Sequence, residues 1–443
     1  MRKMICMFMM ILMSFASVLA QQNQDSLMIK RISDEVFMNG KAYENLRFLC
    51  KKVGPRLSGS AGAALAVDQT ARMLREAGAD TVYLQPCMVP RWERGAKEIG
   101  RASLNNGQTM PLNIVALGNA VATPVGGISA QVIEVKSFKE LEALGADKVK
   151  GKIVFYNYRM DPRFISTFAA YGDAGVYRSA GPSRAAALGA VAVIVRTLSP
   201  VLDDNPHTGA TKYEEGKPKI PAVAISTNGA VELSKAITDG KVGSVYLKTN
   251  CKMLEDVLSY NVIGEIRGAE FPSEVITVGG HLDSWDLAEG AHDDGTGCMQ
   301  SIEIIRAMKA LGIQPKRTIR AVMFMNEENG LRGGTKYGEV AKTENKKFIM
   351  AMESDAGGFT PRGFGFSTDA RQKEKIMSWK PLFHPYGASE FKEGGGGADI
   401  GPLRPLGTAL IGLKPDSQRY MDLHHAKTDV FEAVSERELN LGT

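Results

Sequence analysis

Three short apolar runs in the C-terminal half of the chain each end in histidine or acidic residues. The runs span residues 275–278, 319–325 and 348–352, and they lead respectively to His281 and Asp283, to Glu327 and Glu328, and to Glu353 and Asp355. Between the first two runs, Cys298, Ile302, Ile305 and Met308 recur at helical spacing. Strand–helix–strand order predicts parallel strands joined by crossover helices, whose functional groups gather at the carboxyl ends of the strands. The sequence therefore predicts an α/β fold with a mixed, mainly parallel sheet flanked by helices.

The length of 443 residues exceeds what one hydrophobic core usually serves, so we expect two domains. From about residue 96 to 251 the apolar segments become short and β-like, with Gly and Pro between them. One helical piece is expected there, at 181–188, and His207 is expected to be solvated in a loop. We therefore predict a β-rich inserted domain at 96–251, within a discontinuous domain made of 21–95 and 252–443.

The first 20 residues have the pattern of a secretory signal. Arg2 and Lys3 precede an apolar stretch, and Val18-Leu19-Ala20 is suited to cleavage. An uncleaved membrane anchor is the alternative. No later apolar run reaches the ~20 residues that span a bilayer. The pattern predicts a secreted or periplasmic protein with no membrane span in the mature chain.

Charge and cysteine content exclude some classes of site. The net charge is +5, and no basic run is interleaved with aromatic residues, so nucleic acid is not an expected partner. Beyond the signal the cysteines are Cys50, Cys87, Cys251 and Cys298. They lack the CxxC spacing of a cysteine zinc site, and their spacing assigns no disulfide pairs. Cys298 is expected to be a buried free thiol.

The histidines and carboxylates of the C-terminal half suggest a metal site. Four of the six histidines in the chain lie in the acidic motifs or near the C-terminus: His281, His292, His424 and His425. Many carboxylates converge only around a strong positive charge, because they otherwise raise one another's pKa values. A pair of divalent ions supplies that charge. The spacings also suggest that Asp283 orients His281 and that Asp429 orients His425.

Five motifs in order resemble peptidase family M28, whose members are co-catalytic zinc exopeptidases. They are GGHLDSWD, GAHDDGTG, MNEENG, ESDAGG and HHAKTD. SYNVIGEIRG and HLDSWD are similar in particular to the plasma glutamate carboxypeptidase branch. That resemblance implies a phosphorylase/hydrolase-like zinc-exopeptidase fold and a protease-associated domain as the insertion.

The resemblance also implies the roles of individual residues. The implied ligands are His281 and Asp355 for one zinc, Glu328 and His425 for the second, and Asp293 as the bridge between them. Glu327 is implied as the general base that deprotonates metal-bound water and passes the proton to the leaving amine. The family further implies a cis peptide bond between Asp293 and Asp294. His424 competes with its neighbour His425 for the ligand role, and His292 is not expected to be a ligand.

We therefore expect a secreted or periplasmic dizinc exopeptidase that acts on dipeptides or short peptides, of aminopeptidase or dipeptidase type. Attack by metal-bound hydroxide is the implied reaction, and a homodimer is left open. One alternative is an enzyme like the single-zinc glutaminyl cyclases, which share the fold. The other is a non-catalytic, receptor-like binding protein on a peptidase scaffold.

Overall fold

A mixed eight-stranded sheet forms the centre of the molecule. The computed structural model describes residues 24–443, so the predicted secretory signal lies outside the described residues. The strands, in spatial order, are β1 (Thr81–Glu93), β11 (Lys252–Ile266), β13 (Arg317–Phe324), β12 (Phe271–His281), β14 (Lys347–Glu353), β17 (Ala409–Pro415), β15 (Pro361–Ser367) and β16 (Glu390–Glu393). The four central strands, β13, β12, β14 and β17, are parallel to one another. The predicted mixed, mainly parallel sheet is confirmed.

Helices cover both faces of this sheet. The main ones are α2 (Ala42–Phe48), α3 (Ala61–Glu76), α8 (Thr296–Ala310), α9 (Arg332–Thr343), α10 (Ala370–Phe383) and α12 (Glu436–Gly442). Side chains alternate along β13: Ala321 and Met323 pack in the core with α2, α3 and α8, while Val322 and Phe324 pack in the core with α9. Because both faces are buried, residues 321–324 of β13 are all apolar, which explains why the apolar run in the sequence does not alternate there.

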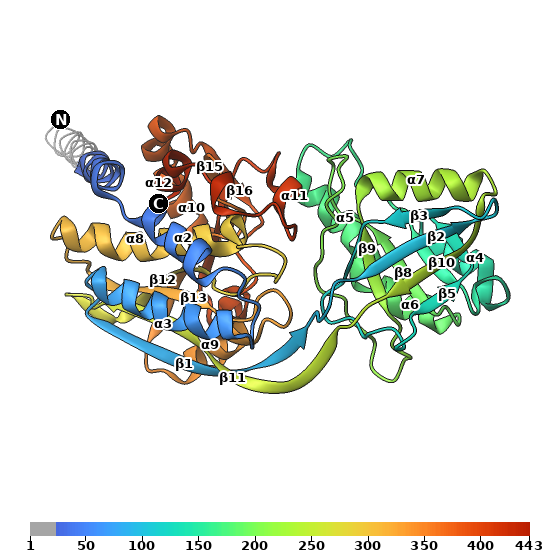
Figure 1. Ribbon diagram of the computed structural model, residues 1–443. Helices are drawn as coiled ribbons and strands as arrows, with labels where there is room; N and C mark the ends of the chain where they lie inside the picture. Colours follow the sequence, from blue (N-terminus) through green and yellow to red (C-terminus); the bar gives the residue numbers. More distant parts are fainter. Residues whose placement is uncertain (1–23) are drawn as a thin grey trace, which may run out of the picture.

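A second lobe, which we call the insert lobe, is built from residues 99–248. Its four-stranded sheet contains β3 (Thr109–Leu112), β2 (Ile99–Leu104), β10 (Val242–Lys248) and β5 (Ile128–Ala130). Its five-stranded sheet contains β4 (Ile114–Ala116), β9 (Ala222–Ile225), β8 (Ala192–Arg196), β7 (Ile153–Tyr156) and β6 (Val132–Val135). Figure 1 shows β1 and β11 running side by side from the central sheet into this lobe.

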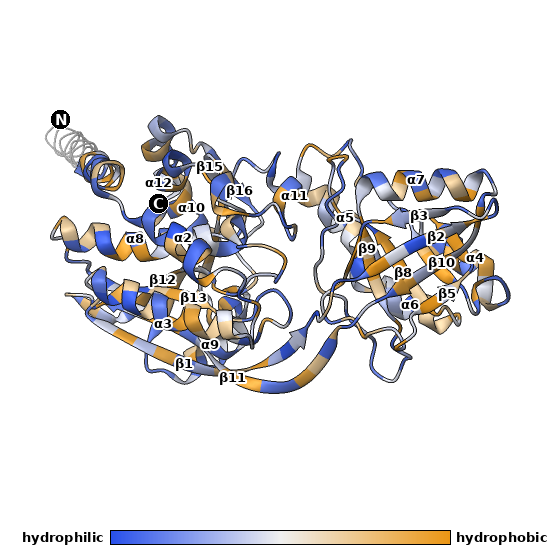
Figure 2. Ribbon diagram, in the orientation of Figure 1, coloured by the Kyte–Doolittle hydropathy of each residue, from blue (hydrophilic) through white to orange (hydrophobic). Residues whose placement is uncertain are grey.

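The insert lobe contains more helix than the sequence suggested. Besides α6 (Gly181–Ala187), which was expected, it has α4 (Phe138–Val149), α5 (Thr167–Ser179) and α7 (Thr227–Thr238). Serine side chains cap the N-termini of α4, α5 and α7. Strands β7, β8 and β9 are buried along their whole length, and Figure 2 shows hydrophobic residues concentrated among the strands of this lobe.

The four cysteines among residues 24–443 form no disulfide bond. Cys50, Cys87, Cys251 and Cys298 are all buried free thiols, and the Cys298 Sγ donates to the carbonyl oxygen of His281. Within residues 24–443, no helix is both long enough and apolar enough to cross a bilayer.

Candidate active site

The three acidic motifs meet at one edge of the central sheet. His281 is the last residue of β12 and pairs in register with Phe324 on β13. Glu327 and Glu328 follow β13, and Asp355 follows β14, whose last residue Glu353 pairs with Gly279 on β12. Because these three strands are parallel neighbours, their carboxyl ends bring the side chains together.

Asp293 lies at the centre of the cluster, on a turn between β12 and α8. Its Oδ1 is 3.2 Å from His281 Nε2, and its Oδ2 is 3.2 Å from His425 Nε2. The peptide bond between Asp293 and Asp294 is cis, as predicted. Asp294 supports the turn, because its carboxylate accepts hydrogen bonds from the backbone amides of His281 and Gly297.

His281 and His425 each have one further carboxylate beside them. Asp355 Oδ1 is 3.5 Å from His281 Nε2, and Glu328 Oε2 is 3.0 Å from His425 Nε2. The two groups therefore have the same composition, one histidine and one carboxylate, and they share the carboxylate of Asp293. All five expected ligands are brought together.

His424 also approaches this cluster. Its Nε2 is 3.6 Å from Asp293 Oδ2, and its ring stacks on that of His425 with centroids 3.6 Å apart. Asp293, His424 and His425 thus form a second arrangement of atoms that could hold a metal. His425, but not His424, also has an ion-pair contact with Glu328 among the described residues. The geometry favours His425 as the partner of Glu328.

Two predicted supporting contacts are wrong in detail. The His281 ring is oriented by the backbone carbonyl of Asp283, which accepts from Nδ1 at 2.9 Å, while the nearest carboxylate oxygen is 3.9 Å away. The Asp283 carboxylate instead accepts from the amides of Asn326 and Glu327, at 2.7 and 3.0 Å. Asp283 therefore fixes the turn that carries Glu327.

Asp429 does not orient His425. Its two oxygens accept hydrogen bonds from the amides of His292 and Asp293, at 2.7 and 3.1 Å. His292 is engaged elsewhere, as expected: its ring stacks on Phe359, and Nδ1 accepts from the Gly358 amide. Sequence spacing could not predict this contact, because the Asp429 side chain bonds to residues just before α8 and not to the nearby His425.

Burial and mutual repulsion shift the ionisation of the cluster. Burial raises the pKa of Glu328 to about 7, and the nearby charge of Asp293 adds to the rise. Burial, followed by the charges of Asp355 and Glu328, also raises the pKa of Glu327 well above its ordinary value. For Asp293, burial acts the same way but is outweighed by both histidines, so its pKa is well below the usual range.

The insert lobe contributes side chains to the surroundings of the two histidines. Arg178 Nη1 is 3.5 Å from His425 Nδ1, and the Thr208 amide donates to the His425 carbonyl at 3.0 Å. Tyr171 packs edge-on against His424. His207 was expected to be solvated, but it is buried at 3% exposure, and burial lowers its pKa to about 4. Sequence reasoning missed these residues because they are distant in the chain.

A cleft of about 630 Å³ lies beside Asp355 and between the two lobes. Its walls include Glu353, the backbone of Gly395–Gly397, Lys414, and Ile165 and Phe168 of the insert lobe. The glycine-rich loop therefore forms part of the wall of this cleft. A peptide could therefore reach Asp355 from solvent.

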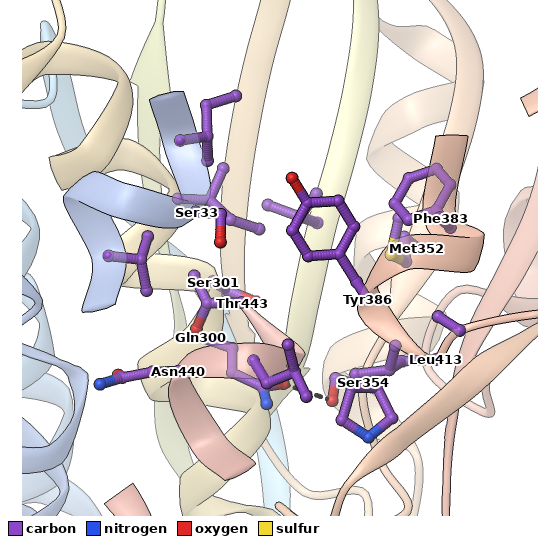
Figure 3. Close-up of a pocket in the computed structure, with 18 of the residues that line it drawn as sticks. Ser33, Gln300, Ser301, Met352, Ser354, Phe383, Tyr386, Leu413, Asn440 and Thr443 are labelled. Atoms are coloured by element: carbon purple, nitrogen blue, oxygen red, sulfur yellow. Dashed lines mark hydrogen bonds between the residues drawn. The ribbon is translucent and has the colours of Figure 1, made fainter. Parts of the chain in front are cut away.

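A second cavity, of about 290 Å³, lies elsewhere on the central sheet. Figure 3 shows Met352, Phe383, Tyr386 and Leu413 lining it, near the residues at the C-terminal end such as Asn440. Among the described residues around it there is no histidine, acidic side chain, lysine or arginine. Its lining therefore lacks metal-binding groups, so the cleft beside Asp355 is the candidate substrate site.

Comparisons with known proteins agree with this geometry. The family model described as "Peptidase family M28" matches residues 261–441. Carboxypeptidase Q of Bos taurus is 35% identical over 404 residues, which are 90% of this chain and 82% of that protein. Carboxypeptidase Q of Homo sapiens is 34% identical with the same coverage. The chain belongs to peptidase family M28. As a member of this family it is a metallo-exopeptidase.

Solved structures of the M28 fold are similar as well. The peptidase M28 precursor from Shewanella amazonensis SB2B has a TM-score of 0.90 and 30% identity, and covers 95% of this chain and 94% of that one. BSAP, a zinc aminopeptidase from Bacillus subtilis, has a TM-score of 0.64 at 22% identity, with coverage of 90% and 91%. Because the sequence identity to BSAP is only 22%, this similarity shows a shared fold and nothing about function.

Proposed function

We propose that this M28 peptidase is a dizinc enzyme that removes single residues from dipeptides or short peptides. The observation that carries the proposal is the spacing of ligand atoms around Asp293. Two ligands bound at ~2.0–2.1 Å to a tetrahedral zinc ion lie ~3.3 Å apart. The four contacts among His281, Asp293, Asp355, Glu328 and His425 measure 3.2, 3.5, 3.2 and 3.0 Å. These distances fit two ions that share one carboxylate.

Buried oxygen atoms without hydrogen-bond partners also support a site for two zinc ions. Asp293 Oδ2 and Glu328 Oε1 are buried and accept no hydrogen bond in the described residues. A buried carboxylate oxygen without a donor is costly, because it has lost its water. Both oxygens belong to expected ligands, so bound cations would compensate for that loss. We assign His281 and Asp355 to one zinc, Glu328 and His425 to the other, and Asp293 to both.

Bound zinc would lower the pKa of water and polarise the peptide carbonyl. Side chains of the protein would transfer the protons. Glu327 is half-buried at the cluster, and the Asp283 carboxylate holds its amide in place. We assign Glu327 as the base that takes a proton from water and returns it to the leaving amine. Its raised pKa makes the carboxylate a stronger proton acceptor than an ordinary glutamate.

Metal analysis of three variants tests the ligand assignment. Wild-type protein should contain two zinc ions per chain and hydrolyse a panel of dipeptides. Asp293→Ala should lose both ions, whereas Asp355→Ala and Glu328→Ala should each lose one. A single ion in the wild type would favour a glutaminyl cyclase-like enzyme. Two ions without hydrolysis would favour a binding protein.

Three further proposals concern the insertion, export and assembly of the protein. We propose that residues 96–251 form an inserted protease-associated domain, which fits the end of β1 at Glu93 and the start of β11 at Lys252. We propose export to the periplasm or outside the cell, on the basis of the signal-like pattern of residues 1–20. A homodimer remains a prediction, which sedimentation would test.

A further inference from the structure

His425 lies in a backbone conformation that histidine seldom adopts. Residues 423–426 form a tight turn, closed by a hydrogen bond of 2.9 Å from the Ala426 amide to the Leu423 carbonyl oxygen. His424 has φ −50° and ψ 119°, and His425 has φ +62°. These angles match a type II turn, whose third residue is usually glycine or asparagine. The proposed ligand His425 therefore occupies a strained position, which persists only with support from outside the turn.

The insert lobe supplies such support to the backbone of His425. The Thr208 amide donates a hydrogen bond to the His425 carbonyl oxygen at 3.0 Å. Thr208 is 1% exposed, so the bond is shielded from water, where a hydrogen bond is electrostatically stronger. This bond fixes the orientation of the peptide unit that follows His425.

The segment that carries Thr208 is anchored within the insert lobe. Thr208 Oγ1 donates to the carbonyl oxygen of Ala116, the last residue of β4, at 2.9 Å. The Gly118 amide donates to the Gly209 carbonyl oxygen at 3.0 Å. Because these bonds tie the segment to the end of β4, Thr208 moves with the lobe. The position of the lobe therefore decides whether the contact with His425 forms.

The ring of His425 is also enclosed by the insert lobe. Gly209 has φ +125°, and a Cβ built on it would lie 2.7 Å from His425 Nδ1 and still closer to the Arg178 guanidinium. Arg178 Nη1 is 3.5 Å from the same nitrogen, and Arg178 Nη2 donates to the Tyr171 hydroxyl at 2.6 Å. From the other domain, Trp285 packs edge-on against the ring. Glycine at position 209 therefore allows the lobe to approach His425 this closely.

The other proposed zinc ion has its ligands on the central sheet. His281 ends β12, and its Nδ1 is bonded to the Asp283 carbonyl oxygen at 2.9 Å. Asp355 follows β14. These supports come from the domain that carries the ligands themselves. Dependence on the insert lobe therefore distinguishes the ion at Glu328 and His425 from the ion at His281 and Asp355.

We propose that docking of the insert lobe is coupled to binding of the zinc ion at Glu328 and His425, with Thr208 and Gly209 as positioning residues for His425. This inference rests on the proposed function. Because the lobe holds His425 in its ligating orientation, loss of the lobe contact weakens that zinc site. Coupling is reciprocal, so zinc at that site strengthens the lobe contact by the same factor.

Zinc titration against a competing chelator tests the effect of the lobe on the metal. Gly209→Ala should weaken one zinc site by about 10- to 100-fold, the range for groups that orient metal ligands, and leave the other site at wild-type affinity. Gly216→Ala is the matched control, because Gly216 also has a positive φ, +73°, in the same lobe but has open space around it. This control should keep both sites.

Two single-ion backgrounds identify the site that is weakened. In Asp355→Ala protein, which should keep the ion at Glu328 and His425, addition of Gly209→Ala should weaken zinc binding by the same factor. In Glu328→Ala protein, which should keep the ion at His281, Gly209→Ala should leave zinc affinity unchanged. A purely structural effect of the glycine substitution would not separate the two backgrounds.

Hydrogen exchange tests the effect of the metal on the lobe and needs no substitution in the insert lobe. Addition of zinc to metal-free wild-type protein should slow exchange of the Thr208 amide by about 10- to 100-fold. Glu328→Ala protein, which keeps only the other ion, should show no such slowing. This measurement also decides the coupling if Gly209→Ala protein fails to fold.

Three results would overturn the coupling. One is a Gly209→Ala protein that binds both ions with wild-type affinity. Another is equal weakening of both ions, which would indicate a general loss of packing. The third is unchanged exchange of the Thr208 amide when zinc is added. A wild-type protein that binds fewer than two ions would instead count against the proposed function, while exchange at Thr208 still decides the coupling.

Discussion

The carboxylate of Asp429 holds the backbone of Asp293 through a hydrogen bond of 3.1 Å from the Asp293 amide. Its other oxygen accepts from the neighbouring amide of His292 at 2.7 Å. Asp429 follows the segment that carries His425, and Asp293 precedes α8. The two parts of the proposed site are therefore joined by a buried contact that does not require metal.

Substitution of Asp429 by alanine should destabilise the protein and weaken metal binding. Removing this acceptor leaves two buried amides unpaired, which costs about 1–3 kcal/mol for each. Urea unfolding of the metal-free protein would measure the loss. Asp147→Ala, at an exposed position on α4, is the control and should change stability by less than about 0.5 kcal/mol. Equal stability of the two variants would contradict the role given to Asp429.

Glu327→Gln should retain both zinc ions and lose catalysis. Glutamine preserves the shape of the side chain but cannot accept the proton, so kcat should fall by about 10²- to 10⁴-fold. Metal analysis and steady-state kinetics on a dipeptide would separate the two effects. Asp283→Asn is an informative companion, because it weakens the acceptor for the Glu327 amide and should reduce kcat less. An active Glu327→Gln enzyme would require a different base.

Zinc should stabilise the folded protein strongly. The cluster collects buried carboxylates that repel one another without a cation, and a ligand that binds only the folded state adds about 2.7 kcal/mol at 100 times its Kd. Thermal unfolding with chelator and with added zinc would show a large upward shift of Tm. The Asp293→Ala variant should show little shift. The same shift in both proteins would place the stabilising metal elsewhere.

The metal-free protein should lose stability as the pH rises through about 7. Burial raises the pKa of Glu328 and of Asp429 to about 7, above their ordinary values, so the folded state binds more protons than the unfolded chain. Their contribution is complete at low pH and is lost as the pH passes their folded pKa values. His207 and His292 act in the opposite direction, with pKa values of about 4, but only below about pH 6.5, the ordinary value for histidine.

Urea unfolding between about pH 6.5 and 8 would measure this dependence of the free energy of unfolding on pH. His207 and His292, whose pKa values are lowered, no longer contribute in that range. Stability of the chelated protein should fall across this range. With zinc bound, Glu328 is already deprotonated, so its share of the fall should disappear and only the share of Asp429 should remain. A rise in stability of the chelated protein would contradict the proposed ionisation of the carboxylates.

The local residue pattern was sufficient to predict the central sheet and the acidic residues at its edge. The runs before His281, Glu327 and Asp355 are mostly apolar, with Thr277 and Arg320 as the polar members, because β12, β13 and β14 lie in the middle of the sheet. Such runs identify strands with both faces covered. The insert lobe was less predictable, and α4, α5 and α7 were missed. Their capping serines are common in turns too, so only packing against the strands distinguishes these helices from loops.

Local sequence pattern dictates which residue types end the central strands, and hence that carboxylates and histidines converge at one edge of the sheet. The way in which these side chains pair depends on the tertiary structure. His281 is oriented by the carbonyl of Asp283 rather than by its carboxylate, Asp429 holds Asp293 rather than His425, and Arg178 reaches His425 from the insert lobe. Residue spacing predicts which way side chains point within one strand or helix. These contacts instead join segments that are far apart in the sequence, and their distance depends on the packing of the whole chain.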